Sequence, residues 1–150
     1  MTGAAGEGAG PIPLEPGARR PVWRGVMLGA LAAAYAGLIF VLSAQANPLP
    51  FLPRAIFSHD RVLHAIAYAL LGGLLAAALG STRLRPGRVL ALAALVASLY
   101  GASDEWHQAH VPGRQADPID WAADTTGAVV GAALLAASLR RQRARASIRA

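Results

Sequence analysis

The chain has 150 residues, of which 55% are hydrophobic and only 15% are charged, and its mean hydropathy is +0.41; this balance excludes an ordinary soluble domain and is typical of a membrane protein. The absence of cysteine excludes a disulfide framework, a thiolate zinc site and a cysteine nucleophile. A net charge of +6 would also suit a nucleic-acid-binding protein, but the arginines border apolar segments and are not interleaved with stacking aromatic residues, which argues against nucleic acid as a partner.

Residues 1–22 are rich in Gly, Ala and Pro and have no apolar period, which predicts a disordered tail. Four apolar segments follow, at about 26–42, 62–79, 89–103 and 119–139. A helix that crosses the ~30 Å hydrocarbon layer needs about 20 residues, so the third segment is short unless its polar end also enters the bilayer. We therefore expect an all-α fold, with four transmembrane helices in a compact bundle over residues 23–140 and a basic tail over 141–150.

The arginines are distributed unevenly along this pattern. Of the 14 arginines, only Arg54, Arg61 and Arg114 lie on the side of the loops after the first and third spans. The positive-inside rule therefore places both termini in the cytoplasm and the protein in the inner (plasma) membrane. All four histidines and six of the eight acidic residues then fall in or beside the two outer loops.

The first apolar segment also has features of a secretory signal. It ends in the sequence LSAQA, and Ala44 to Ala46 resembles a signal-peptidase site. The apolar stretch is 17 residues long, whereas the core of a signal peptide has roughly 7 to 15. This length favours retention of the segment as a transmembrane helix.

The start of the second segment carries a polar stripe. Asp60, His64 and Tyr68 recur at intervals of four residues and so share one helix face. One interpretation is a carboxylate that orients an imidazole, which then transfers protons or binds an anionic group. The other is a helix cap with a histidine hydrogen-bonded to it inside the bundle. Ionisable groups at membrane depth are costly, which keeps the functional interpretation open.

A second polar stripe ends the third segment. Its members share one helix face and are Tyr100, Asp104, His107 and Gln108. Glu105 points away from this face. An acidic pair beside a histidine is suited to act as a general base or to bind a ligand. The same residues are equally consistent with the polar end of a short helix that meets water.

The loop that follows presents an arginine. Pro112 and Gly113 predict a turn, after which the planar guanidinium of Arg114 is placed to hold a phosphate or carboxylate at two points. The alternative is an ion pair between Arg114 and Asp117 or Asp120. Asp117 before Pro118 is typical of a helix N-cap, with Asp120 three residues later as a capping-box acid.

Asp124 lies about one turn inside the fourth span, where a carboxylate must find a partner or take up a proton. Arg114, Arg61 and His64 are the candidate partners. Farther along, the two glycines of residues 127–131 form a GxxxG face, which predicts close helix packing.

Metal binding has little support at this level. Histidine and carboxylate groups are acceptable zinc ligands, but the chain has no HExxH or comparable motif, and the pairs Asp60–His64 and Asp104–His107 are weak signals alone. We therefore expect neither a metal nor another cofactor.

The sequence resembles the VanZ-like family of small bacterial membrane proteins over about residues 25–140. The resemblance rests on motifs in a fixed order: Asp60 to His64 with Tyr68, Asp104 to Gln108, Val111 to Arg114, and Asp120 followed by Thr125 to Ala128 and Gly131. Two positions depart from the family pattern. Arg61 stands where lysine is common, which keeps the charge and changes its geometry, and Asp124 stands where asparagine is common, which adds a buried acid.

The resemblance implies an integral membrane protein whose founding relatives lower susceptibility to glycopeptide antibiotics, particularly teicoplanin. It supplies no reaction, and many members lie outside resistance clusters, so resistance is not assigned to this chain. The lipid bilayer is the one partner that the composition itself implies.

Two functions stay open. In the first, Arg61 and Arg114 hold an anionic envelope component such as a lipid-linked phosphate, while His64, His107 and the nearby acids move a proton. In the second, a noncatalytic module shields or scaffolds envelope machinery, and its polar cluster locks the helices together. Transport ranks third, because four spans leave little room for two gates without oligomerisation. The sequence leaves open whether the protein is an enzyme and in which oligomeric state it acts.

Overall fold

The computed structural model describes residues 22–45 and 60–148, and the regular structure in these ranges is entirely α-helical. The helices are α1 (Val22–Ser43), α3 (Asp60–Gly80), α4 (Pro86–Gln108) and α5 (Pro118–Ile148). Each is long and apolar enough to span a membrane. The four-helix, all-α membrane fold expected from the sequence is thus confirmed, while the tail expected over residues 1–22 lies, apart from Val22, outside the described residues.

Two helices are longer than the apolar segments that predict them. α4 has 23 residues and includes the polar stretch 104–108, so the third span is not short. Pro86 begins it, at a position where the missing N–H of proline costs nothing. α5 has 31 residues because the Arg- and Ala-rich segment after Leu139, made of good helix formers, continues the helix through most of the expected basic tail.

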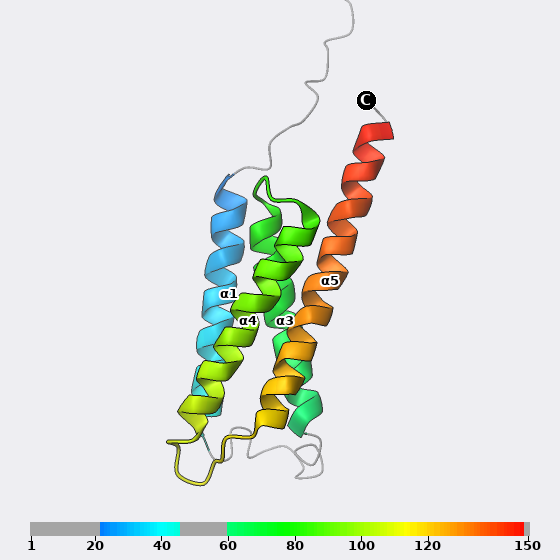
Figure 1. Ribbon diagram of the computed structural model, residues 1–150. Coiled ribbons are helices and arrows are strands. Elements are labelled where there is room, and N and C mark those ends of the chain that lie inside the picture. Colours follow the sequence, from blue (N-terminus) through cyan, green and yellow to red (C-terminus); the bar gives the residue numbers. More distant parts are fainter. Residues whose placement is uncertain (1–21, 46–59, 149–150) are drawn as a thin grey trace, which may run out of the picture.

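The helices run alternately up and down, so the bundle has two distinct ends (Figure 1). At the arginine-rich end, α1 and α4 begin and α3 and α5 finish. Exposed arginines surround this end: Arg24, Arg83, Arg85, Arg88, Arg140, Arg141, Arg143 and Arg145. At the polar end, α3 and α5 begin and α1 and α4 finish. The described loop of the polar end joins α4 to α5 over residues 109–117.

α3 is the central helix of the bundle. It has the most extensive contacts with the other described helices, above all with α5, whereas α1 and α5 do not contact each other within the described ranges. The approach of α3 to α5 is very close, since a Cβ atom added to Gly127 or Gly131 would collide with the carbonyl oxygen of Ala65 or Ala69. This confirms the predicted packing role of the GxxxG face. It also fixes which side chains near the starts of α3 and α5 face one another.

The bundle interior is built largely from small side chains. Buried residues include Ala97 and Ala128 near the middle and Ala93 and Ala132 nearer the arginine-rich end. Large apolar side chains such as Leu134 point outward instead. An apolar surface of this extent is suited to lipid.

Tryptophans flank this apolar surface near both ends. Trp23 lies one residue into α1, whereas Trp106 and Trp121 lie near the polar end, and all three are exposed. Such placement is typical of aromatic anchors at the two membrane–water interfaces.

Candidate functional site

The loop between α4 and α5 begins with a tight turn. The backbone N–H of Arg114 donates to the carbonyl of Val111 at 3.0 Å, and Pro112 and Gly113 occupy the two central positions. Gly113 has φ 83°, a left-handed conformation that glycine adopts without steric cost. The predicted turn is confirmed, and it brings Arg114 back toward the end of α4.

The start of α5 is fixed by two hydrogen bonds at Asp117. Its carboxylate Oδ1 accepts from the backbone N–H of Ile119 at 2.8 Å, so the predicted N-cap is confirmed. The Asp117 N–H donates to Glu105 Oε2 at 2.8 Å. The capping-box prediction gave that N–H to Asp120, whereas Glu105 of α4 accepts it. Glu105 therefore connects α4 to the first residue before α5, so the hydrogen bond joins two helices.

His64 and Asp124 form a polar contact between α3 and α5. Asp124 Oδ1 lies 2.9 Å from His64 Nδ1, and the Asp124 side chain is 0% exposed. The close approach of α3 to α5 makes this contact possible, since His64 lies one residue before Ala65, whose carbonyl faces Gly127. Of the three partners expected for Asp124, the structure thus selects His64.

Asp104 belongs to a chain of hydrogen bonds that crosses the bundle. Its Oδ2 accepts from Ser43 Oγ of α1 at 2.8 Å and from Gln108 Nε2 at 3.0 Å. Gln108 Oε1 in turn accepts from Arg114 Nη2 at 2.6 Å. The chain runs from the half-buried Arg114 in the loop to the buried Asp104 and on to α1, so Asp104 and Gln108 of the predicted stripe are brought together.

Arg61, not Arg114, makes the ion pairs with the acids at the start of α5. Its Nη2 lies 3.5 Å from Asp117 Oδ2 and its Nε lies 3.7 Å from Asp120 Oδ1. The alternative in which Arg114 pairs with Asp117 or Asp120 is therefore wrong. The Arg61 side chain is 59% exposed, and pairs this long and exposed hold an arginine weakly.

Three carboxylates are buried at the polar end. The relative exposures are 2% for Asp104, 7% for Glu105 and 0% for Asp124. In each, one oxygen is hydrogen-bonded and the other, Asp104 Oδ1, Glu105 Oε1 or Asp124 Oδ2, has no partner among the described residues. None of the described arginines forms an ion pair with these three acids. Buried carboxylates that are only partly satisfied are costly, so protons, a cation or a ligand must offset their charge.

The centre of the site draws on three helices. His64 of α3, Glu105 of α4 and Asp124 of α5 each offer a ligand atom, and these atoms all lie within 4.8 Å of one another. We call these residues the central cluster. Glu105 does point away from the stripe of Asp104, as expected, but it points toward α3 and α5. Spacing within one helix gave no sign of that neighbourhood.

Tyr68 borders the central cluster. Its side chain is 1% exposed, and its hydroxyl has no partner among the described residues. A Cβ added to Gly101 would lie 3.1 Å from Asp124 Oδ2 and 3.3 Å from Tyr68 Cε1, so both side chains use the space left by this glycine. His64 and Tyr68 are thus on one face of α3, as predicted, and both face the interior. Asp60 begins α3, but its side chain lies outside the described residues.

The remaining stripe residues face α1. The His107 ring stacks on Phe40 with centroids 4.3 Å apart, and its Nε2 has no hydrogen-bond partner within the described ranges. Tyr100 donates its hydroxyl to the carbonyl of Ala36 at 2.6 Å. His107 is therefore not joined to the central cluster. Ser43, the partner of Asp104, was missed by sequence reasoning, although a serine that ends an apolar helix is a usable signal.

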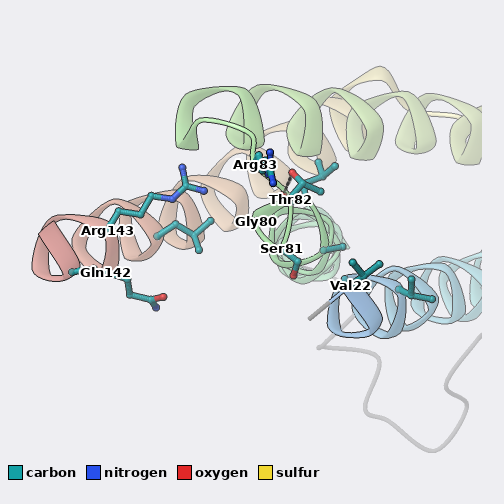
Figure 2. Close-up of a pocket in the computed structure, with 13 residues that line it drawn as sticks. Val22, Gly80, Ser81, Thr82, Arg83, Gln142 and Arg143 are labelled. Atoms are coloured by element: carbon teal, nitrogen blue, oxygen red, sulfur yellow. Dashed lines mark hydrogen bonds between the residues drawn. The ribbon is translucent and has the colours of Figure 1, made fainter. Parts of the chain in front are cut away.

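A groove of about 990 Å³ lies at the opposite, arginine-rich end, between the start of α1 and the far ends of α3 and α5 (Figure 2). Apolar side chains, Ser81, Thr82 and Gln142 line it together with Arg83 and Arg143. Its lining has no acid or histidine and none of the site residues predicted from the sequence. The groups needed for proton transfer or metal binding are therefore at the polar end.

Comparison with known proteins identifies a family. The family model described as VanZ/LLP1 matches residues 31–140, a range that begins within α1, ends within α5 and includes the whole central cluster. No curated protein and no solved structure matches the chain. The resemblance inferred from the motifs is confirmed.

Proposed function

Because the chain belongs to the VanZ/LLP1 family and its four described helices are long and apolar enough to span a membrane, we propose that its polar end binds an anionic component of the cell envelope and acts on it. The observation that carries this proposal is the set of three buried, partly satisfied carboxylates beside two arginines. A membrane bundle of this size would be at least as stable with apolar residues at those positions. Ionisable residues buried inside a membrane bundle therefore favour a functional site.

Each part of the polar end has a role in this proposal. Arg61 is exposed and weakly paired, and Arg114 is half-buried on the loop, so both guanidinium groups can turn toward a phosphate and hold it at two points. His64 and Asp124 lie within hydrogen-bond distance and can exchange a proton with a bound group. A lipid-linked phosphate is the ligand class that fits a site at the membrane boundary.

The orientation belongs to the same proposal. The exposed arginines of one end favour the cytoplasm, so we place both termini there, in the inner membrane, with the polar end facing outward. We also propose that α1 is retained, because Ser43 supplies a hydrogen bond to the buried Asp104. Glycopeptide susceptibility is then one readout among several of an altered envelope.

A second candidate is a noncatalytic scaffold or shielding module. It is favoured by the bonds of Ser43 to Asp104 and of Glu105 to the Asp117 N–H, which join α1 to α4 and α4 to α5. In that case the polar groups serve the fold alone. The two candidates differ in how loss of function scales with the amount of folded protein.

The test is lipid profiling by mass spectrometry in cells whose own gene is deleted. These cells express the wild-type protein, Arg114→Ala, Asp124→Asn or the control Arg85→Ala. Arg85 is exposed at the arginine-rich end, and its side chain makes no cap hydrogen bond. We expect both polar-end variants to change an envelope lipid or its precursor at normal protein abundance, and the control to match the wild type. A phenotype lost only in proportion to abundance contradicts the proposal and supports the scaffold.

A further inference from the structure

The central cluster assembles a metal-ligand set that no segment of the sequence contains by itself. His64, Glu105 and Asp124 come from α3, α4 and α5, and their ligand atoms all lie within 4.8 Å of one another. In the folded chain, the packing of three helices brings the ligand atoms together, whereas a motif such as HExxH would place them close in one segment. This explains why the sequence alone predicts no metal site.

The donor types narrow the ion. An imidazole with two carboxylates suits Zn²⁺ and related first-row ions, whereas Mg²⁺ and Ca²⁺ favour oxygen ligands. Around a tetrahedral ion with bonds of about 2.0–2.2 Å, ligand atoms lie roughly 3.3 Å apart. The ligand atoms of the central cluster, which all lie within 4.8 Å of one another, would have to approach by up to roughly 1.5 Å to bind such an ion.

Unpartnered buried atoms supply an independent indication of a ligand. Glu105 Oε1 and Asp124 Oδ2 have no hydrogen-bond partner among the described residues, and the same is true of the Tyr68 hydroxyl. Tyr68 is 1% exposed, and its ring lies beside Asp124 Oδ2 across the space left by Gly101. Three buried oxygens, one from each of α3, α4 and α5, thus have unused hydrogen-bonding capacity, and they belong to the central cluster or to the tyrosine that borders it.

The charge of the site also calls for a cation. Two carboxylates of the central cluster and the adjacent Asp104 are buried together, and their negative charge would repel any anion held by Arg61 and Arg114. A divalent ion balances Glu105 and Asp124 and leaves the arginines free to act on the ligand. Protonation of the carboxylates is the competing way to neutralise the cluster. The metal content of the purified protein distinguishes protonation from metal binding.

We infer that His64, Glu105 and Asp124 bind one divalent first-row metal ion, with Zn²⁺ as the best fit. The inference deepens the proposed function and rests on it for its biological meaning. When bound, such an ion polarises a phosphoryl oxygen or activates water. The chain itself contributes the three ligands, the Tyr68 hydroxyl beside them, and the arginines that position an anion.

The test uses the full chain in detergent, purified with a tag that lacks histidine. After chelator treatment and removal of the chelator, Zn²⁺ is titrated and bound metal is measured by mass spectrometry. We expect one Zn²⁺ per chain, no displacement by excess Mg²⁺, and binding at least 10-fold weaker in His64→Ala, Glu105→Gln and Asp124→Asn. The matched control His110→Ala, whose ring bonds the carbonyl of Trp106 outside the cluster, should bind as the wild type does.

Two results would overturn the inference. One is wild-type protein that binds no Zn²⁺ and whose melting temperature Zn²⁺ leaves unchanged, and this measurement stands even if a cluster variant fails to fold. The other is equal binding by the wild type and a folded cluster variant. A protein without metal that still alters envelope lipids would leave the proposed function standing with protons at the cluster, whereas metal binding without a lipid effect would leave the metal site and remove the function.

Discussion

The two ends of the bundle carry charge in opposite ways. At the arginine-rich end the described arginines are exposed, and the groove there combines two of them with apolar and hydroxyl side chains (Figure 2). At the polar end, Asp104, Glu105 and Asp124 lie between the helices. Exposed charges at a membrane boundary cost little and favour one orientation. Buried acids are expensive, and this difference directs the search for function to the polar end.

The largest expected effect tests the helix contact that holds the polar end together. Gly127→Leu would push a side chain into the backbone of Ala65 and separate α3 from α5, at a cost of about 3 kcal/mol or more. We expect little folded protein in detergent extracts. The control is Gly29→Leu, because a Cβ at Gly29 meets nothing within 4 Å. If both variants have wild-type melting temperatures, α3 and α5 do not pack as described.

The second prediction separates stability from function at Asp124. In metal-free protein, Asp124→Asn removes a buried charge while keeping the size of the side chain, so we expect an unchanged or higher melting temperature together with loss of the lipid phenotype. Thermal denaturation gives the melting temperature, and lipid profiling of the same variant gives the lipid phenotype. A variant that loses both in parallel would place Asp124 among the structural residues.

The third prediction concerns the bond between α1 and α4. Ser43→Ala removes one of the two donors to Asp104 Oδ2 and should lower the free energy of unfolding by about 1–3 kcal/mol, because a buried acid loses a hydrogen bond that no solvent contact replaces. Ser103→Ala is the matched control, since its exposed hydroxyl bonds only the carbonyl of Tyr100. Equal unfolding free energies for the two variants would mean that α1 contributes little to the polar end.

The smallest effect on stability is expected at Arg61. Its pairs with Asp117 and Asp120 are long and exposed, so Arg61→Ala should change the free energy of unfolding by less than about 1 kcal/mol. The same substitution should still impair the lipid phenotype, whereas Arg88→Ala at the other end should change neither. A large loss of stability in Arg61→Ala would mean that this arginine holds the fold, not a ligand.

The sequence predicts the elements of this molecule better than their neighbours. Four apolar stretches locate the helices, and Asp117 before Pro118 locates the start of α5, because both signals are local in the chain. The bond between Ser43 and Asp104 joins residues 61 positions apart. Whether two such groups meet depends on how each helix is rotated in the bundle, and one sequence carries no direct record of that rotation.

Glu105 illustrates the same limit within the site. Helical spacing correctly separates it from the stripe of Asp104, but it does not say which neighbour lies on the other side. His64 could be proposed as the partner of Asp124 because so few cations are available near the polar end. The convergence of all three residues required the close approach of α3 to α5, which the glycines at 127 and 131 predict only as packing.

The most direct test of an outward-facing polar site uses the absence of cysteine from the chain. Single-cysteine variants Gln115→Cys at the polar end and Arg85→Cys at the arginine-rich end would be treated in intact cells with a membrane-impermeant thiol reagent. We predict labelling of position 115 in intact cells and of position 85 only after the membrane is opened. Labelling of position 85 but not 115 in intact cells would contradict the account, because the buried acids would then face the cytoplasm.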